Sequence, residues 1–145
     1  MKRVLTAVLC LVLSLSLAGC GSGKGFDPAN VRMEVVDGSV NPSKLIVHVI
    51  NNTKTDIAGG IDDDYTVEKR VNGEWSPVEE VGTRSGKTET YIFQGERELT
   101  VNWAGLCGTL TAGDYRITKV FYPLEKGGSS PSGGSFSLSA EFRIE

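Results

Sequence analysis

The sequence contains 145 residues with 15 basic and 18 acidic side chains, so its formal net charge is −3 at neutral pH. This length suits one domain with a core of its own. A net acidic chain without a cluster of lysine and arginine lacks the electrostatic footprint of a nucleic-acid-binding protein, so we expect no nucleic acid as partner.

The first twenty residues have the organisation of a targeting signal. Lys2 and Arg3 form a positively charged start, residues 4–17 form an apolar run, and Leu17-Ala18-Gly19-Cys20 ends the segment with small residues. This run of fourteen residues reaches about 21 Å as a helix, short of the roughly 30 Å hydrocarbon core of a bilayer. This argues against an uncleaved membrane anchor. A plain secretory signal would use the same small residues but leaves the cysteine unexplained.

The segment resembles a bacterial lipoprotein signal peptide that spans residues 1–19. The resemblance implies cleavage between Gly19 and Cys20 and attachment of a diacylglyceryl group to the Cys20 thiol. Two acyl chains anchor a protein stably, so the mature chain is expected on the extracytoplasmic face of the cell membrane. Removal of the signal leaves 126 residues with 13 basic and 18 acidic side chains, a net charge near −5. Membrane attachment must then come from lipid and not from a basic patch.

The cysteine count limits the covalent chemistry of the mature chain. Of the three cysteines, Cys10 leaves with the signal and Cys20 is expected to carry lipid. Cys107 then remains as a single thiol, and no intramolecular disulfide is expected. The hydrophobic core must therefore stabilise the domain without a covalent cross-link.

The mature chain is expected to begin with a tether and to continue as a β domain. Residues 20–30 start with a glycine-rich stretch, which is typical of a flexible coil. From residue 31 onward, short runs alternate apolar and polar residues without an apolar period of helical length. The run at 45–50 is almost entirely apolar, which predicts a strand covered on both faces. The predicted strands lie at residues 31–35, 45–50, 65–71, 74–75, 99–103, 115–121 and 136–144, with an eighth candidate at 90–93.

Turn residues between these runs indicate the architecture. Asn72-Gly73 predicts a hairpin with a type I′ turn. Seven to eight short strands separated by turns predict an all-β, antiparallel β-sandwich over residues 31–145. Residues 127–135 have the glycine and serine content of a linker, but the ten residues that follow alternate clearly as a strand. The segment is therefore expected to be a loop between the last two strands.

Five segments carry a resemblance to a known family. They are residues 64–69, 72–75, 101–103, 108–119 and 139–144. Together they resemble the bacterial Ig-like domain found in many Gram-positive lipoproteins, which implies an Ig-like sandwich and brings no general catalytic or ligand-binding residues. In the most specific segment, Gly113 permits a tight corner. The hydroxyl of Tyr115 is expected to bond back to nearby backbone, as a tyrosine corner does.

Two segments have some features of a phosphate site and of a calcium site. Residues 82–88 (Gly-Thr-Arg-Ser-Gly-Lys-Thr) have three residues between the glycines, whereas a Walker A sequence has four. Asp62, Asp63 and Asp64, with Asp56 nearby, offer oxygen ligands for calcium, but consecutive strand residues point to opposite faces. We interpret the two segments as a solvent-exposed loop and as solvated charges, and expect no metal site.

Four further side chains invite a functional interpretation. His48 and Cys107 could in principle form a base and a nucleophile, but His48 lies within a strand and Cys107 within a turn, so structural roles are preferred. Trp103 ends an apolar face and is expected in the core. Trp75 is expected to cover the sheet, with a partner-binding anchor as the alternative.

The sequence predicts a lipid-anchored cell-envelope protein with one Ig-like domain and no enzymatic activity or cofactor. Its expected role is binding, with an envelope protein, a peptide or a wall polymer as partner, and the binding residues are not identified by the sequence. An alternative is an extracytoplasmic proteinase inhibitor that would use the loops at 81–87 or 127–135. A third hypothesis is a structural spacer, for which one small domain gives little reach.

Overall fold

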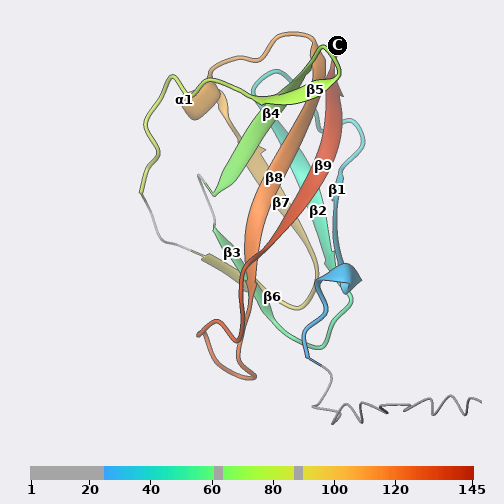
Figure 1. The fold of residues 1–145 in the computed structure, drawn as a ribbon, viewed down its shortest axis with the longest axis vertical. Coiled ribbons are helices and arrows are strands. Elements are labelled where there is room, and N and C mark those ends of the chain that lie inside the picture. The colour runs from blue at the N-terminus through green and yellow to red at the C-terminus, as the bar shows by residue number, and fades with distance from the viewer. Residues whose placement is uncertain (1–24, 61–63, 87–89) are drawn as a thin grey trace, which may run out of the picture.

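The computed structural model describes residues 25–60, 64–86 and 90–145 (Figure 1). Within these residues the chain forms nine β-strands and almost no helix, which confirms the predicted all-β class. In chain order the elements are η1 (Pro28–Asn30), β1 (Val31–Val35), β2 (Lys44–Asn51), β3 (Ile57–Gly60), β4 (Tyr65–Val71), β5 (Glu74–Pro77), β6 (Thr90–Phe93), β7 (Gly95–Asn102), α1 (Ala104–Cys107), β8 (Gly113–Pro123) and β9 (Phe136–Ile144).

The strands form two antiparallel sheets that pack face to face. Among the described residues, one sheet has the order β1-β2-β7, and the other has the order β5-β4-β8-β3-β6 with β9 also paired to β8. One edge of β8 pairs with β9 along residues 113–121, and its other edge pairs first with β4 and then with β3. All of these pairings are antiparallel, as the sequence predicts.

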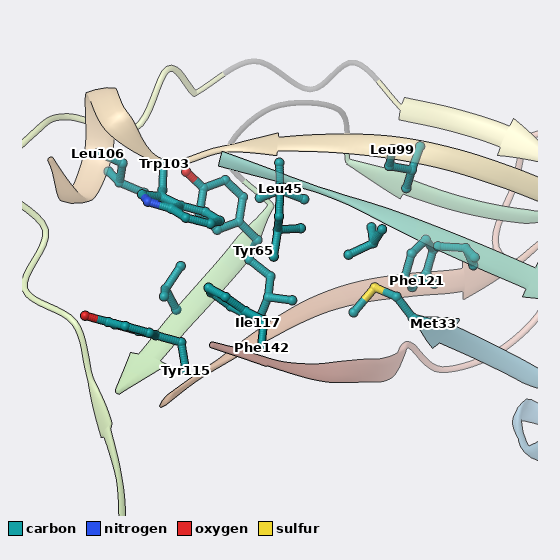
Figure 2. Close-up of a cluster of buried hydrophobic side chains, with 14 of the residues drawn as sticks. Met33, Leu45, Tyr65, Leu99, Trp103, Leu106, Tyr115, Ile117, Phe121 and Phe142 are labelled. Atoms are coloured by element: carbon teal, nitrogen blue, oxygen red, sulfur yellow. The ribbon is translucent and has the colours of Figure 1, made fainter. Parts of the chain in front are cut away.

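The core lies between the two sheets and follows the alternation seen in the sequence (Figure 2). Alternate residues of β2 point inward, and Leu45, Val47 and Val49 are completely buried. The prediction that both faces of this strand are covered is only partly right. Ile46 and His48 on the outer face are half-buried, because β2 lies in a sheet with the second sheet on one side only.

The sequence prediction missed β3, which is four residues long and contains two glycines. Gly59 faces the core, where a β-carbon would lie 2.7 Å from the ring of Phe121, so only glycine leaves room for that ring. The run from Gly59 to Tyr65 stands opposite the much shorter run from Lys119 to Phe121 on β8, an excess of four residues. This excess separates β3 from β4.

The fold begins before β1. Phe26, which the sequence assigns to the tether, packs against Phe136 on β9 with 5.0 Å between the ring centres. Asp27 caps η1 by accepting a hydrogen bond from the amide of Ala29 at 3.0 Å. Residues 26–30 are therefore held against the sandwich. The glycine- and serine-rich segment at 127–135 lies between β8 and β9, in the place expected for it.

The corner that leads into β8 has the predicted form. Gly113 has a φ of +151°, a conformation that side-chain-bearing residues rarely adopt. The hydroxyl of Tyr115 donates a 2.7 Å hydrogen bond to the carbonyl of Thr111, which is the arrangement of a tyrosine corner. The Tyr115 ring is 1% exposed and therefore serves the core and the corner at once.

We predict that Tyr115→Phe lowers the free energy of unfolding by about 1 kcal/mol, because the carbonyl of Thr111 loses its buried hydroxyl partner while the ring remains packed. Urea denaturation of the variant and the parent measures the difference. Tyr122→Phe is the matched control, since Tyr122 is 40% exposed and its loss should cost less than about 0.5 kcal/mol. Equal effects of the two substitutions would contradict the corner assignment.

Candidate functional site

The two ends of the sandwich differ in what they carry. The N-terminal side of the domain, with Phe26 and η1, lies at the end where β1 begins opposite Asn51. The other end of β2 pairs Lys44 with Asn102, directly before α1. Figure 1 shows α1 and the chain that follows β5 at the end opposite η1. We call residues 78–86 the latched loop and this region the α1 end.

Backbone hydrogen bonds fix the latched loop to α1. The amides of Val81 and Gly82 both donate to the carbonyl of Leu106, at 2.8 and 2.9 Å. A β-carbon on Gly82 would lie 1.8 Å from the carbonyl oxygen of Gly105, so this close approach requires glycine. The side chain of Val81 remains 71% exposed next to this contact. The α1 end therefore presents an apolar side chain on a positioned backbone.

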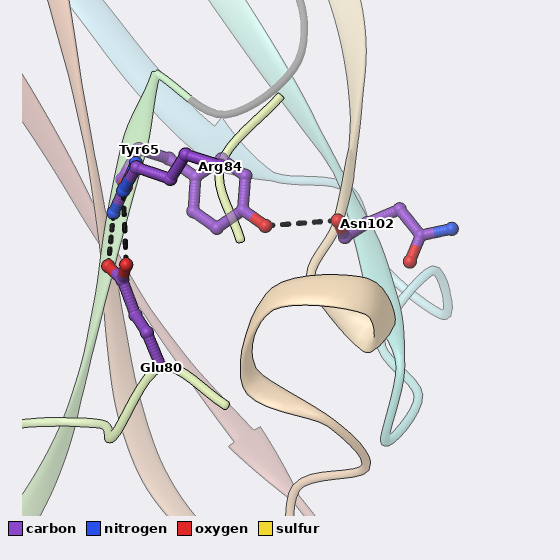
Figure 3. A network of polar contacts seen from close by, with 4 residues as sticks. All are labelled: Tyr65, Glu80, Arg84 and Asn102. Carbon is purple, nitrogen blue, oxygen red and sulfur yellow. Dashed lines mark hydrogen bonds and ion pairs between the residues drawn. The ribbon is translucent and has the colours of Figure 1, made fainter. Parts of the chain in front are cut away.

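A polar network ties the same loop to the second sheet (Figure 3). Arg84 pairs with the carboxylate of Glu80 and donates a 3.2 Å hydrogen bond to the carbonyl of Tyr65 on β4. The hydroxyl of Tyr65 in turn donates to the carbonyl of Asn102 at the end of β7, at 3.0 Å. The network links the loop, β4 and β7. The sequence did not signal the contacts of Arg84 with Tyr65 and of Tyr65 with Asn102, because these partners are far apart along the chain.

Cys107 lies half-buried at the end of α1 beside the latched loop. Burial raises the pKa of its thiol above the ordinary value, the carboxylate of Glu80 raises it further, and the guanidinium of Arg84 opposes them. A raised pKa keeps the thiol protonated at neutral pH, whereas a nucleophilic cysteine needs the thiolate. The environment therefore favours the structural interpretation of Cys107.

His48 has a different set of neighbours. It lies on β2 opposite Glu34 of β1 and Glu98 of β7, and its Nε2 is 3.2 Å from the carboxylate of Glu96. The thiol of Cys107 instead lies within the electrostatic reach of Glu80 and Arg84. The structure thus gives the histidine and the cysteine separate environments and does not assemble a base and nucleophile pair from them.

The aspartate cluster is described only in part. Asp62 and Asp63 lie outside the described residues, while the Asp64 carboxylate accepts a 3.1 Å hydrogen bond from the amide of Gly60. The ammonium group of Lys119, a residue that is 1% exposed, donates to the carbonyls of Gly60 and Asp64 at 3.2 and 3.1 Å. In the described part of the chain, no three acidic, histidine or cysteine side chains gather to hold a metal ion.

The two tryptophans take the places expected for them. Trp103 is completely buried, and its indole donates a 2.9 Å hydrogen bond to the carbonyl of Pro42. Trp75 is half-buried on the outer face of its sheet, with the guanidinium carbons of Arg70 and Arg116 at 5.7 and 4.9 Å from its ring centre. Two cations thus flank the Trp75 ring, which covers the sheet as predicted.

Several sequence-predicted residues fall outside the described structure. Gly19 and Cys20 belong to the first 24 residues, and Lys87 and Thr88 of the phosphate-loop-like segment are also outside it. In the described residues, no helix has the length and apolar character needed to cross a bilayer.

A model of the bacterial Ig-like domain family matches residues 27–143, which is most of the chain. The chain belongs to the bacterial Ig-like domain family. Neither the curated proteins nor the solved structures include a match to this sequence. Domains of this family are typically non-catalytic, and the two-sheet arrangement and the Tyr115 corner agree with the Ig-like fold.

The Ig-like domain leaves the Cys107 thiol in reach of reagents, which gives a direct test of its environment. We predict that iodoacetamide labels Cys107 of unlipidated residues 21–145 at pH 7 more slowly than it labels a free cysteine derivative, because the raised pKa lowers the thiolate fraction. Glu80→Gln should increase the labelling rate, since it removes a charge that raises the pKa and leaves Arg84 to lower it.

Glu79→Gln is the matched control, because Glu79 is an exposed neighbour that does not contribute to the raised pKa of Cys107. Its labelling rate should equal that of the parent. Labelling of the parent faster than the free cysteine derivative would indicate an activated thiolate and would contradict the structural interpretation.

Proposed function

We propose that the protein is a lipid-anchored binding domain on the extracytoplasmic face of the cell membrane, without catalytic activity of its own. The Leu17-to-Cys20 sequence supports the lipid anchor, and family membership supports the binding role. Sandwich domains of this kind present loops and sheet edges on a rigid frame. The partner is another envelope protein or a peptide segment.

This proposal depends on one observation, which is that Phe26 and α1 lie at opposite ends of the sandwich. The described chain begins at the Phe26 end, whereas the latched loop and α1 lie at the other end of β2. The eight residues of β2 span about 26 Å at roughly 3.3 Å per residue. A domain tethered through its N-terminus would therefore hold the α1 end away from the bilayer, accessible to a partner.

The anchor is tested by replacing the proposed lipid-carrying residue. We predict that Cys20→Ser abolishes incorporation of labelled palmitate and moves the protein from the membrane fraction to the soluble fraction, because the thiol that receives the lipid is gone. Cys107→Ser is the control and should keep both the label and the membrane location. A Cys20→Ser protein that remains in the membrane fraction would argue for a different anchor.

The binding role is tested on intact cells. A photo-crosslinking residue in place of Val81 at the α1 end, and another in place of Ser139 on β9, should each be examined for specific adducts by mass spectrometry. Recovery of the same envelope partner in independent cultures supports the proposal. Absence of any specific adduct at both positions would favour a passive surface domain.

A second candidate function is proteinase inhibition, and the latched loop is the observation that favours it. Its backbone is held by two hydrogen bonds to Leu106 while Val81 is 71% exposed, and a preorganised loop loses less entropy on binding. In that case the protein should inhibit an extracytoplasmic protease at stoichiometric amounts, and Val81→Asp should weaken inhibition by about tenfold or more. Cleavage of the loop without inhibition would remove this candidate.

A further inference from the structure

One side of the sandwich is formed by β1 and β9, which are both edge strands of their sheets. The two strands belong to different sheets and run next to each other (Figure 1). Within the described residues, β1 pairs only with β2 and β9 pairs only with β8. Each strand therefore has one edge without a strand partner in the described structure.

The unpaired edge of β9 is the longest strand edge in the described structure. Proteins guard edge strands by keeping them short or by placing charges and proline on them. The edges at β1, β5 and β6 are five, four and four residues long, and β5 ends in Pro77. The edge at β7 carries the charges of residues 96–98. β9 is nine residues long, and its charged residues, Glu141 and Arg143, lie in its second half, whereas residues 137–140 are Ser, Leu, Ser and Ala.

The inner face of β9 is also incompletely covered. Its core-facing residues Phe136, Leu138 and Ala140 are only half-buried. The equivalent core-facing residues of the neighbouring strand β8, such as Ile117 and Phe121, are completely buried. A strip of apolar surface is therefore left open along β9, at the position where one more strand would cover it.

A groove of about 470 Å³ begins at Ala140, at the C-terminal end of this strip, and lies between residues 33–40 on the β1 side and residues 140–143 of β9. Its apolar walls include Val35, Val36 and Val40 from the β1 side and Ala140 from β9. This volume falls in the range of roughly 300–1,000 Å³ that is usual for ligand sites. The groove thus offers apolar contacts beside a row of backbone groups that are able to pair.

The charges around the groove favour a basic occupant. Three carboxylates, Glu34, Asp37 and Glu141, line the groove with one cation, Arg143. Glu34 pairs with Arg32, whereas Asp37 and Glu141 form no ion pair within the described residues. Arg143 pairs with Asp114 at 2.9 Å and lies 3.8 Å from Glu145. The groove therefore has an acidic character, in line with the acidic balance of the mature chain.

We propose that the β1–β9 groove binds an extended segment of a partner protein, in which basic and apolar residues alternate, as an additional strand on β9. Main-chain hydrogen bonds to β9 supply the affinity, and alternate side chains supply the specificity. The apolar residues cover the open strip at Leu138 and Ala140, while the basic residues meet Asp37 and Glu141. This inference rests on the proposed binding function and names the surface that performs it.

The test uses the unlipidated mature chain and a nine-residue peptide of alternating lysine and valine with blocked ends. Amide hydrogen exchange followed by NMR should show slower exchange at alternate residues of β9 when the peptide is added, because their outward N–H groups become paired. A peptide with glutamate in place of lysine should bind at least about tenfold more weakly, since it repels the acidic groove.

Substitutions on the protein complete the test. Asp37→Lys with Glu141→Lys should weaken binding of the lysine–valine peptide by about tenfold or more, because both attractive charges become repulsive. Glu74→Lys with Glu98→Lys is the matched control, since it changes the net charge equally at exposed residues away from the groove. Its affinity should equal that of the parent within about twofold.

Three outcomes would overturn the proposal. The first is that the lysine–valine peptide leaves the amide exchange rates of β9 unchanged, and the second is that the glutamate peptide binds as tightly as the lysine–valine peptide. The third is that the protein alone dimerises with the amides of β9 protected, which would make a second copy the occupant of the groove. The proposed function fails separately. If the peptide protects β9 but no partner is captured on cells, the groove stands and the binding role does not. If a partner is captured only through position 81 and the peptide does not protect the amides of β9, the binding role stands and the groove proposal does not.

Discussion

An aromatic stack holds the two sheets together, and the described structure has no disulfide that could do so in its place. Phe142 of β9 stacks between Trp103 and Tyr115, with ring centres 5.4 and 5.5 Å apart (Figure 2). Trp103 also donates from its indole to Pro42 and from its backbone to Ser43. Aromatic pairs at these distances combine large buried area with a defined geometry. The α1 end, the β8 corner and β9 therefore depend on the same three rings.

The sequence could predict the parts of the fold that depend on local pattern. Alternation identified β9, Asn72-Gly73 identified a hairpin, and the Gly113-to-Tyr115 segment identified the corner, because each of these signals lies within a few residues. β3 gave no such signal. Ile57 to Gly60 form a strand by pairing with β6 and β8, and Gly59 leaves room for the ring of Phe121, so these contacts join residues far apart in the chain.

The proposed binding surfaces also combine features that local sequence predicts with features that depend on long-range contacts. The composition of residues 81–87 predicted a loop, but the attachment of its described part to Leu106 and its link through Arg84 to Tyr65 are tertiary contacts. The open edge of β9 was equally hidden, because alternation shows that a strand has two faces and does not show which edge lacks a partner. The latched loop and α1 share no residue with the lining of the β1–β9 groove.

The interruption between β3 and β4 affects how the domain can change. β3 and β4 each pair with β8 in their own register. On its other edge β3 pairs with β6, and β4 pairs with β5. Lys119 holds the two ends of the interruption together through the carbonyls of Gly60 and Asp64. Insertions or deletions between these two residues would shift neither register, so this is a position where related chains can differ in length while the core stays the same.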